Sequence, residues 1–226
     1  MRFLIVILLF VFNAPLLLEA QSMKVVQDFR TRTTLGIEKE LTKQLNMYAE
    51  LESGLEENIS YLGKLHAEGG IEYELFKFID LQVSYRFSKN RKNYSDEYKY
   101  THRLALAAQI SHEVKRLKVY YRLQYQNTDE DALEAAPQKF ENLIRNRLKF
   151  RYNVWGSKID PFCYTELYLL AGNNGIDATK LKTVAGIEFP VSNMVEVKLY
   201  YRNDRELSGF IPYTYHTAGV SIYFEL

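Results

Sequence analysis

The chain has 226 residues, and its 29 Lys and Arg residues almost balance its 28 Asp and Glu residues, for a formal net charge of +1. This balance lacks the basic excess typical of proteins that bind nucleic acid, so no nucleic-acid partner is expected. Tyr is abundant, with 18 residues beside 13 Phe. Both favour strands, and Tyr also favours membrane–water interfaces. Cys163 is the only cysteine, which excludes an internal disulfide.

The first twenty residues are typical of a secretory signal peptide. A positively charged start precedes the apolar run 3–18, and Ala20 offers a small residue at a cleavage point. A membrane anchor is the alternative, but the run is shorter than the ~20 residues that span a bilayer, and an Asn and a Pro interrupt it. We therefore expect a signal peptide over residues 1–20 and one mature domain over 21–226.

Alternation of apolar and polar residues predicts strands along the whole mature domain. Residues 79–88, 117–126 and 195–202 alternate without a fault, and a period of two is the signature of a strand. Most segments have about ten residues or more, close to the ~9–11 that cross a bilayer. About twelve such segments are expected, over residues 22–30, 33–42, 45–55, 61–75, 79–88, 98–112, 116–126, 143–154, 159–171, 180–190, 194–203 and 213–226.

Short and long connections alternate between these segments. The short ones are expected at 42–44, 76–78, 112–115, 155–158 and 190–193, and the long ones at 89–97, 127–142, 172–179 and 203–212. This alternation is typical of the periplasmic turns and extracellular loops of outer-membrane barrels. An even number of strands would place the N- and C-termini together on the periplasmic side.

One face of each segment is apolar, as lipid contact requires. Leu81, Val83 and Tyr85 share a face in one segment, and Val220 and Ile222 share a face in the last. An aromatic girdle is expected near segment ends, at Tyr98, Tyr100, Tyr125, Trp155 and Tyr213. The predicted fold is all-β, an up-and-down antiparallel transmembrane β-barrel of about twelve strands in the outer membrane of a Gram-negative cell. A secreted soluble barrel of lipocalin type is the alternative, with its apolar side chains inside.

Several strand motifs also resemble an uncharacterised outer-membrane barrel family. They are 35–43 (LGIEKELTK), 83–87 (VSYRF), 102–104 (HRL), 120–125 (YYRLQY), 145–152 (RNRLKFRY) and Glu166-Leu167 after Pro161. The sequence resembles, over about residues 25–226, the family filed as the domain of unknown function numbered twenty-four ninety. The resemblance implies an outer-membrane barrel, and it implies no activity or catalytic residue.

Charged residues on the inward face divide by sign along the chain. The earlier segments carry carboxylates and the later ones carry cations, which gives the candidate lumen-lining residues Glu38, Glu40, Glu50, Glu52, Glu68, Glu72, Glu74, Arg86, Arg103, Arg122, Arg145, Arg147, Lys149 and Arg151. Two interpretations remain open. The two groups could pair and plug a narrow interior, or they could stay apart around water and attract anionic solutes to the cations. A twelve-stranded barrel lies between filled and open sizes.

No catalytic, cofactor or metal motif is found, so the protein is expected not to be an enzyme and to need no cofactor. Its four histidines, at 66, 102, 112 and 216, lack metal-ligand spacing, and no Ser lies in a Gly-flanked elbow. The acidic stretch 127–134 lacks the Gly and the spacing of a calcium loop. A hydrolase at the outer rim is the third functional alternative, and His102 would be the first residue to test.

The sequence thus predicts an integral outer-membrane barrel whose partners are membrane lipid and small solutes or ions. The leading hypothesis is a narrow, porin-like channel for small or anionic solutes through a charged lumen. A closed structural or surface-interaction barrel, plugged by Arg–Glu pairs, is the alternative hypothesis. No protein partner is indicated by the sequence.

Overall fold

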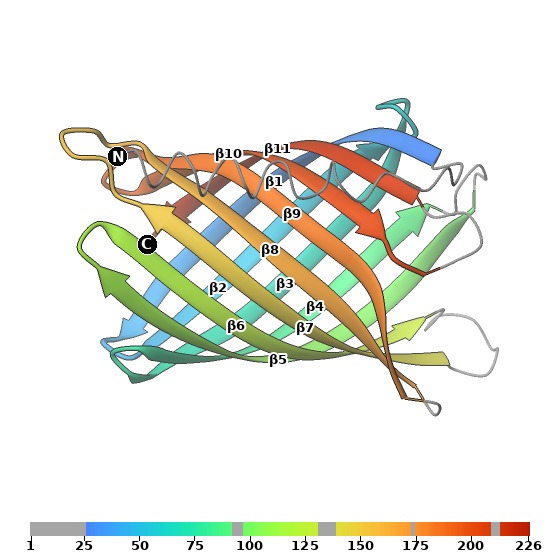
Figure 1. The fold of residues 1–226 in the computed structure, drawn as a ribbon, viewed down its shortest axis with the longest axis horizontal. Helices are drawn as coiled ribbons and strands as arrows, with labels where there is room; N and C mark the ends of the chain where they lie inside the picture. The colour runs from blue at the N-terminus through green and yellow to red at the C-terminus, as the bar shows by residue number, and fades with distance from the viewer. Residues whose placement is uncertain (1–25, 92–96, 131–138, 173–174, 209–212) are drawn as a thin grey trace.

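The computed structural model is a closed β-barrel (Figure 1), and it describes residues 26–91, 97–130, 139–172, 175–208 and 213–226. The expected signal peptide 1–20 and residues 131–134 of the acidic stretch lie outside the described residues. In chain order the strands are β1 (Val26–Thr42), β2 (Leu45–Glu56), β3 (Tyr61–Phe76), β4 (Ile79–Arg91), β5 (Tyr98–Val114), β6 (Leu117–Glu130), β7 (Lys139–Tyr152), β8 (Asp160–Gly172), β9 (Gly175–Ser192), β10 (Val195–Glu206) and β11 (Tyr213–Glu225).

These eleven strands match the predicted segments with one difference at the N-terminal end. The segments expected at 22–30 and 33–42 form one strand, β1, in the part of the chain that is described. Asp28, Arg30, Arg32 and Thr34 keep one unbroken alternation of buried side chains through the expected turn. Nothing in the local sequence favours a reversal there, so the chain continues straight.

The barrel closes through a parallel pair of strands. β1 pairs with β2 in the antiparallel sense and with β11 in the parallel sense, from Val26 opposite Tyr213 to Glu38 opposite Glu225. All the other neighbouring pairs are antiparallel. An odd number of strands makes the first and last strands run the same way. Val26 and Leu226 therefore lie at opposite ends of the barrel. The prediction that both termini lie on the same side rested on an even number of strands, and the eleven described strands do not support it.

The connections define two rims. The short-turn rim is the end of the barrel that holds the connections 43–44, 77–78, 115–116, 153–159 and 193–194. The long-loop rim is the opposite end, where the strands that are linked in sequence through residues 57–60, 92–97, 131–138, 173–174 and 207–212 have their ends. The short-turn rim lies at the left of Figure 1, together with the C-terminus. Two lengths differ from the prediction. The connection 173–174 is short because β9 begins at Gly175, and 153–159 is longer than expected.

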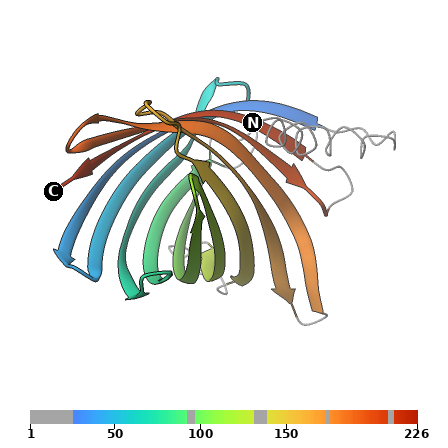
Figure 2. The same ribbon diagram turned by 60° about the vertical axis from the view of Figure 1, so that its left-hand side comes forward.

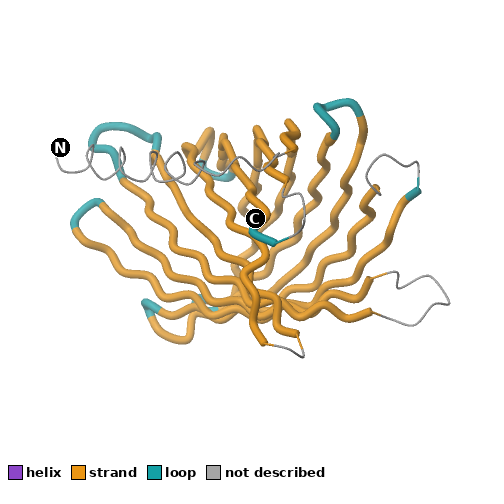
Figure 3. The backbone as a smooth tube through the Cα atoms, turned by 45° about the vertical axis from the view of Figure 1, so that its right-hand side comes forward, coloured by secondary structure: helices purple, strands orange, loops and turns teal. Residues whose placement is uncertain are grey.

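The distribution of side chains is inverted relative to a soluble domain. Among the described residues, eighteen buried side chains are polar or charged and only five are hydrophobic. Large apolar residues such as Leu51, Val83 and Leu106 are about half exposed on the outer wall. Strand makes up the whole wall, and the connections lie at its ends (Figures 2 and 3). Among the described residues, no helix has the length and apolar character needed to cross a bilayer. An apolar exterior around a charged interior is the arrangement that a membrane barrel requires.

Small residues on the inward face let neighbouring side chains lie flat on the wall. Tyr223 covers Gly36, Tyr48 covers Gly70 and Tyr200 covers Gly219, each within 2.6 Å of where a Cβ would be. Each pair occupies directly opposed positions on adjacent strands. Gly186 differs from these glycines, because the closest atom to its added Cβ would be backbone, the Leu199 oxygen at 2.3 Å. These positions keep bulky Tyr side chains against the wall.

Gly186→Ala should destabilise the barrel, because the new methyl group collides with backbone that the β9–β10 ladder fixes. We expect a loss of about 1–3 kcal/mol in the free energy of unfolding. Urea unfolding in lipid vesicles, followed by the fluorescence of the single Trp155, measures it. Gly172→Ala is the matched control, since nothing lies within 4 Å of its added Cβ. Equal stability of the two variants would contradict the packing described here.

Candidate functional site

Charged groups line the lumen, and one buried cluster of them surrounds Glu166 on β8. The Glu166 side chain is only 1% exposed and accepts a two-pronged contact from Arg145 of β7, with Nη2 at 2.8 and 2.9 Å from its two oxygens. Arg147 Nη2 lies at 3.1 Å and Lys182 Nζ, from β9, at 3.2 Å. The Tyr168 hydroxyl donates a further bond of 3.1 Å. One carboxylate thus serves three cations, which leaves a local positive excess.

This cluster follows from strand register. Arg147 lies directly opposite Glu166, and Glu166 lies directly opposite Lys182 on the next strand. Directly opposed side chains on one face of a sheet stand about 5 Å apart, so register alone brings the charges together. Arg145 and Lys182 also lie over the ring of Tyr168, 4.8 and 5.1 Å from its centre. The ring adds cation–π attraction to the ion pairs.

A second cluster, centred on Glu68 of β3, continues the positive wall. Arg86 of β4 and Arg103 of β5 both pair with Glu68, Arg103 Nη2 at 2.9 Å. These two arginines lie directly opposite one another. Like charges in directly opposed positions destabilise a sheet unless they share a counter-ion, and Glu68 is shared in that way.

Arg122 of β6 differs from every other arginine of these clusters. It lies directly opposite Arg147, and it donates a hydrogen bond to the amide oxygen of Gln82. Within the described residues it has no carboxylate partner, and its buried Nε has no acceptor. Gln82 in turn donates to the Tyr48 hydroxyl at 2.7 Å. Arg122 is therefore a guanidinium whose charge the described chain does not neutralise.

Near the long-loop rim the lumen is occupied by ion pairs. Arg30 Nε lies 2.6 Å from Asp28, and Arg32 Nη2 lies 2.6 Å from Glu56. The Arg32 side chain is 1% exposed. Arg30 also stacks on Tyr215 of β11, at 3.6 Å from the ring centre. Arg30 and Arg32 are thus each paired with carboxylates, in contrast to Arg122 in the middle.

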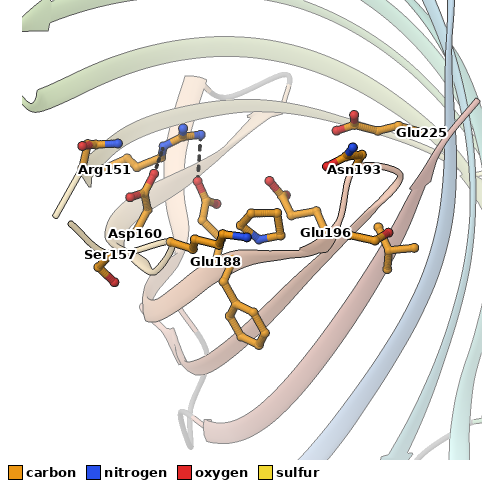
Figure 4. A pocket seen from close by; sticks show the side chains of 13 residues that line it. Arg151, Ser157, Asp160, Glu188, Asn193, Glu196 and Glu225 are labelled. Atoms are coloured by element: carbon orange, nitrogen blue, oxygen red, sulfur yellow. Dashed lines mark ion pairs between the residues drawn. The ribbon is translucent and has the colours of Figure 1, made fainter. Parts of the chain in front are cut away.

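The opposite mouth, at the short-turn rim, is acidic. Arg151 bridges Asp160 at 3.3 Å and Glu188 at 2.9 Å beside a cavity of about 370 Å³, which Glu196 and Glu225 also line (Figure 4). The inward-facing carboxylates near this mouth that have no ion pair among the described residues are Glu225 and, beyond the cavity, Glu38, Glu40, Glu72, Glu74, Asp80 and Glu113. Their strands, β11, β1, β3, β4 and β5, belong to one half of the wall. The cations of β7, Arg145, Arg147, Lys149 and Arg151, belong to the other half.

The structure places the fourteen candidate lumen-lining residues on the inward face, but the partners differ from a simple pairing of two walls. Glu68 pairs with Arg86 and Arg103, while Glu52 lies 3.5 Å from Arg32 and Glu50 accepts from Tyr223. Glu38, Glu40, Glu72 and Glu74 stand at the mouth. The later cations instead pair with Glu166 and with Glu188, to which Lys149 and Arg151 both bind.

Sequence reasoning missed the carboxylates of β8 and β9 and the cations at the ends of the chain. Glu166 is the single acidic residue within 161–172 of β8, Glu188 is the single one within 178–192 of β9, and alternation puts both inward. Such a single inward carboxylate is the signal that could have found them. Arg30 and Arg32 were missed because a turn was expected beside them. Tyr213, expected in the girdle, stacks on Tyr215 at the inward face.

Two of the histidines, His102 and His216, make contacts on the outer wall. His102 lies on the outer wall, where Nδ1 meets the Tyr85 hydroxyl and its ring lies 5.1 Å from Phe87. His216 makes a similar outer contact with Tyr201. In the described ranges, no group of three His, Cys, Asp or Glu side chains is placed to hold a metal ion.

Glu166→Gln should strongly destabilise the barrel, because it leaves Arg145, Arg147 and Lys182 buried beside a neutral amide. Removing one partner of a buried charge cluster costs about 3–5 kcal/mol. Urea unfolding in vesicles measures the change. Glu74→Gln removes an exposed carboxylate that has no ion pair in the described structure, and it should change stability by less than about 0.5 kcal/mol. Similar effects from both variants would refute a special role for Glu166.

Several solved structures are similar to this chain. The translocator domain of autotransporter NalP from Neisseria meningitidis is 14% identical, covers 73% of this chain and 70% of its own, and has a TM-score of 0.46. The NanC porin is 13% identical, the match covers 78% of this chain and 84% of the NanC chain, and the TM-score is 0.47. The siderophore receptor PirA from Pseudomonas aeruginosa is 11% identical, the match covers 74% of this chain and 33% of the PirA chain, and the TM-score is 0.32.

Identities this low carry no residue role from those proteins to this one. A search among curated proteins finds no match. The model of one protein family, described as protein of unknown function (DUF2490), matches residues 29–208, which is most of the chain and includes ten of the eleven strands in whole or in part. The closed charged barrel built above is therefore the architecture of a member of the DUF2490 family, to which this chain belongs.

Proposed function

We propose that this protein is an outer-membrane channel that conducts small anionic solutes through its lumen. The observation that carries the proposal is Arg122, a lumen-facing guanidinium opposite Arg147 that has no carboxylate partner in the described chain. Around it, Arg86 and Arg147 keep side-chain exposures of 23% each, so water in the lumen reaches them. Cations in such a low-dielectric passage attract anions strongly.

The proposal includes an orientation. Residues 1–20 would direct export as a signal peptide, and the short-turn rim with Leu226 would face the periplasm. The rim at which β1 begins would then face outward. Short periplasmic turns and longer external loops are general features of such barrels. Lipid is the partner of the outer wall, and no enzymatic activity is part of the proposal.

A closed barrel is the second candidate, and the buried ion pairs favour it. The Arg32 and Glu166 side chains are each 1% exposed, and the interior near the long-loop rim is filled by the pairs around Arg30 and Glu56. If this filling extends across the whole section, the protein would act through its loops or its surface. The unpaired Arg122 in the middle of the lumen supports conduction, whereas the buried ion pairs at the long-loop end support a closed barrel.

Conductance of the refolded protein in a planar bilayer separates the two candidates. A heat-modifiable band on gels first confirms that the barrel has folded. A channel gives steady current steps, and in a KCl gradient its reversal potential shows a preference for chloride. A folded protein without current steps would refute the channel and support the closed barrel.

Arg122→Glu should lower or reverse the anion preference with little effect on folding, because Arg122 has no ion pair to lose among the described residues. A unit charge about 10 Å from the ion contributes roughly 1.7 kcal/mol at an effective dielectric constant of ~20, so reversing one charge shifts the permeability ratio by about tenfold or more before salt screening. Arg147→Glu with Arg151→Glu should act in the same direction, at a cost in stability.

Lys89→Glu is the matched control for Arg122→Glu. Lys89 lies on the outer wall with its Nζ 4.4 Å from the centre of the Tyr98 ring, outside the conduction path. The chloride-to-potassium permeability ratio of the Lys89→Glu variant should equal that of the parent protein. A permeability ratio unchanged by Arg122→Glu would exclude Arg122 as the selectivity element.

A further inference from the structure

The short-turn rim carries cations on its outer side that the channel does not use. Three neighbouring hairpin turns, at 43–44, 77–78 and 115–116, contain Lys43, Lys77, Lys115 and Arg116 and no acidic residue. Lys39 adds a cation on the outer wall of β1, on the same face as Leu35 and Ile37. We call these five residues the basic arc. The turns belong to β1–β6, a contiguous part of the wall.

The basic arc is solvent-exposed and lacks counter-ions. All five residues are exposed, and none of them forms an ion pair within the described ranges. The carboxylates of the same strands, such as Glu40 and Glu113, lie on the inward face and form no ion pair with the arc in the described part of the chain. The turns hold their charges outside the mouth, and the strands hold the acidic groups inside it.

Exposed aromatic side chains accompany these cations. Phe76 and Phe78 flank Lys77, stack at 5.9 Å and are more than half exposed. Trp155 is 81% exposed, and its ring centre lies 5.7 Å from the Arg116 guanidinium. Aromatic rings beside cations at the edge of an apolar wall are the combination that sits at the headgroup level of a bilayer.

The two rims differ in charge. The long-loop connections contain Glu57, Asp96, Glu97, Asp131 and Glu134 against one base, Lys92. The short turns of the arc contain only bases. Cations near a membrane surface are attracted to anionic lipid, whereas acidic loops are not. The short-turn rim is therefore better suited to an anionic leaflet than the long-loop rim.

We propose that the basic arc binds the phosphate groups of anionic phospholipids in the leaflet at the short-turn rim. The aromatic rings set the depth of the rim, and the five cations lie where phosphates of that leaflet would be. This inference rests on the barrel spanning a membrane, as proposed above, but it does not require the lumen to conduct.

Spin-labelled lipids test this binding in reconstituted bilayers. Electron paramagnetic resonance measures how strongly phosphatidylglycerol, relative to phosphatidylcholine, associates with the barrel in phosphatidylcholine vesicles. At low salt we expect the intact protein to prefer phosphatidylglycerol about twofold or more, and high salt should weaken this preference because the cations are exposed. The variant with Lys39, Lys43, Lys77, Lys115 and Arg116 all changed to Gln should lose the preference.

Matched double variants locate the effect. Lys43→Gln with Lys77→Gln should reduce the preference, whereas Lys89→Gln with Arg205→Gln, two outward cations near the other rim, should leave it intact. Equal losses in the two double variants, or a preference that survives in the five-residue variant, would overturn the inference. A barrel that inserts and gives a heat-modifiable band but shows no lipid preference would overturn this inference and leave the proposed function standing. A protein that never inserts would overturn the proposed function as well.

Discussion

The barrel depends on one constraint, which is that every strand must have a neighbour on both sides. In a bilayer there is no water to satisfy an open strand edge, so a wall of strands has to close on itself. Here closure is made by thirteen consecutive opposed positions of β1 and β11, from Val26–Tyr213 to Glu38–Glu225. Once the wall is closed, alternation leaves each side chain two environments only, the apolar exterior and the enclosed interior. The charged lumen is a direct consequence.

Inside the wall, charge is arranged in layers along the axis. The layer at the long-loop rim contains tight pairs such as Arg32 with Glu56. The middle layer has more cations than carboxylates, because Glu68 and Glu166 each serve several bases. The layer at the short-turn rim has more carboxylates than bases. An anion moving along the axis would meet attraction in the middle and repulsion at the short-turn mouth, which would retain it in the centre and limit its escape on that side.

Much of the fold can be read from the sequence, because period-two alternation reports both strand and facing. Runs such as 79–88 and 117–126 predict β4 and β6 within a few residues. The turn expected between 30 and 33 was wrong, since alternation shows where a strand lies but not where a charged strand continues. The family could also be predicted, because its motifs are themselves these alternating strands.

The partners inside the lumen could not be predicted to the same degree. Which residue stands opposite which is set by register, and register depends on the stagger of the closed wall rather than on any local motif. Sequence therefore placed Arg145, Arg147 and Arg151 on the inward face, but it did not indicate that Glu166 and Glu188 would neutralise them. The sequence also could not single out Arg122. This residue is distinctive because the register places Arg147, and no carboxylate, opposite it on β7.

The parallel closing pair has a consequence for the order of folding. Ten of the neighbouring pairs join consecutive strands and can form locally as hairpins, whereas Val26 and Tyr213 are about 190 residues apart in the chain. The length-dependent entropy of bringing such distant segments together is about 5 kcal/mol, and it can be recovered only when the last seam forms. Closure should thus be the slow, final step, and until it occurs both β1 and β11 present open edges. If the barrel is an outer-membrane protein, as proposed, any chaperone that guards it before insertion would have these two strands to protect.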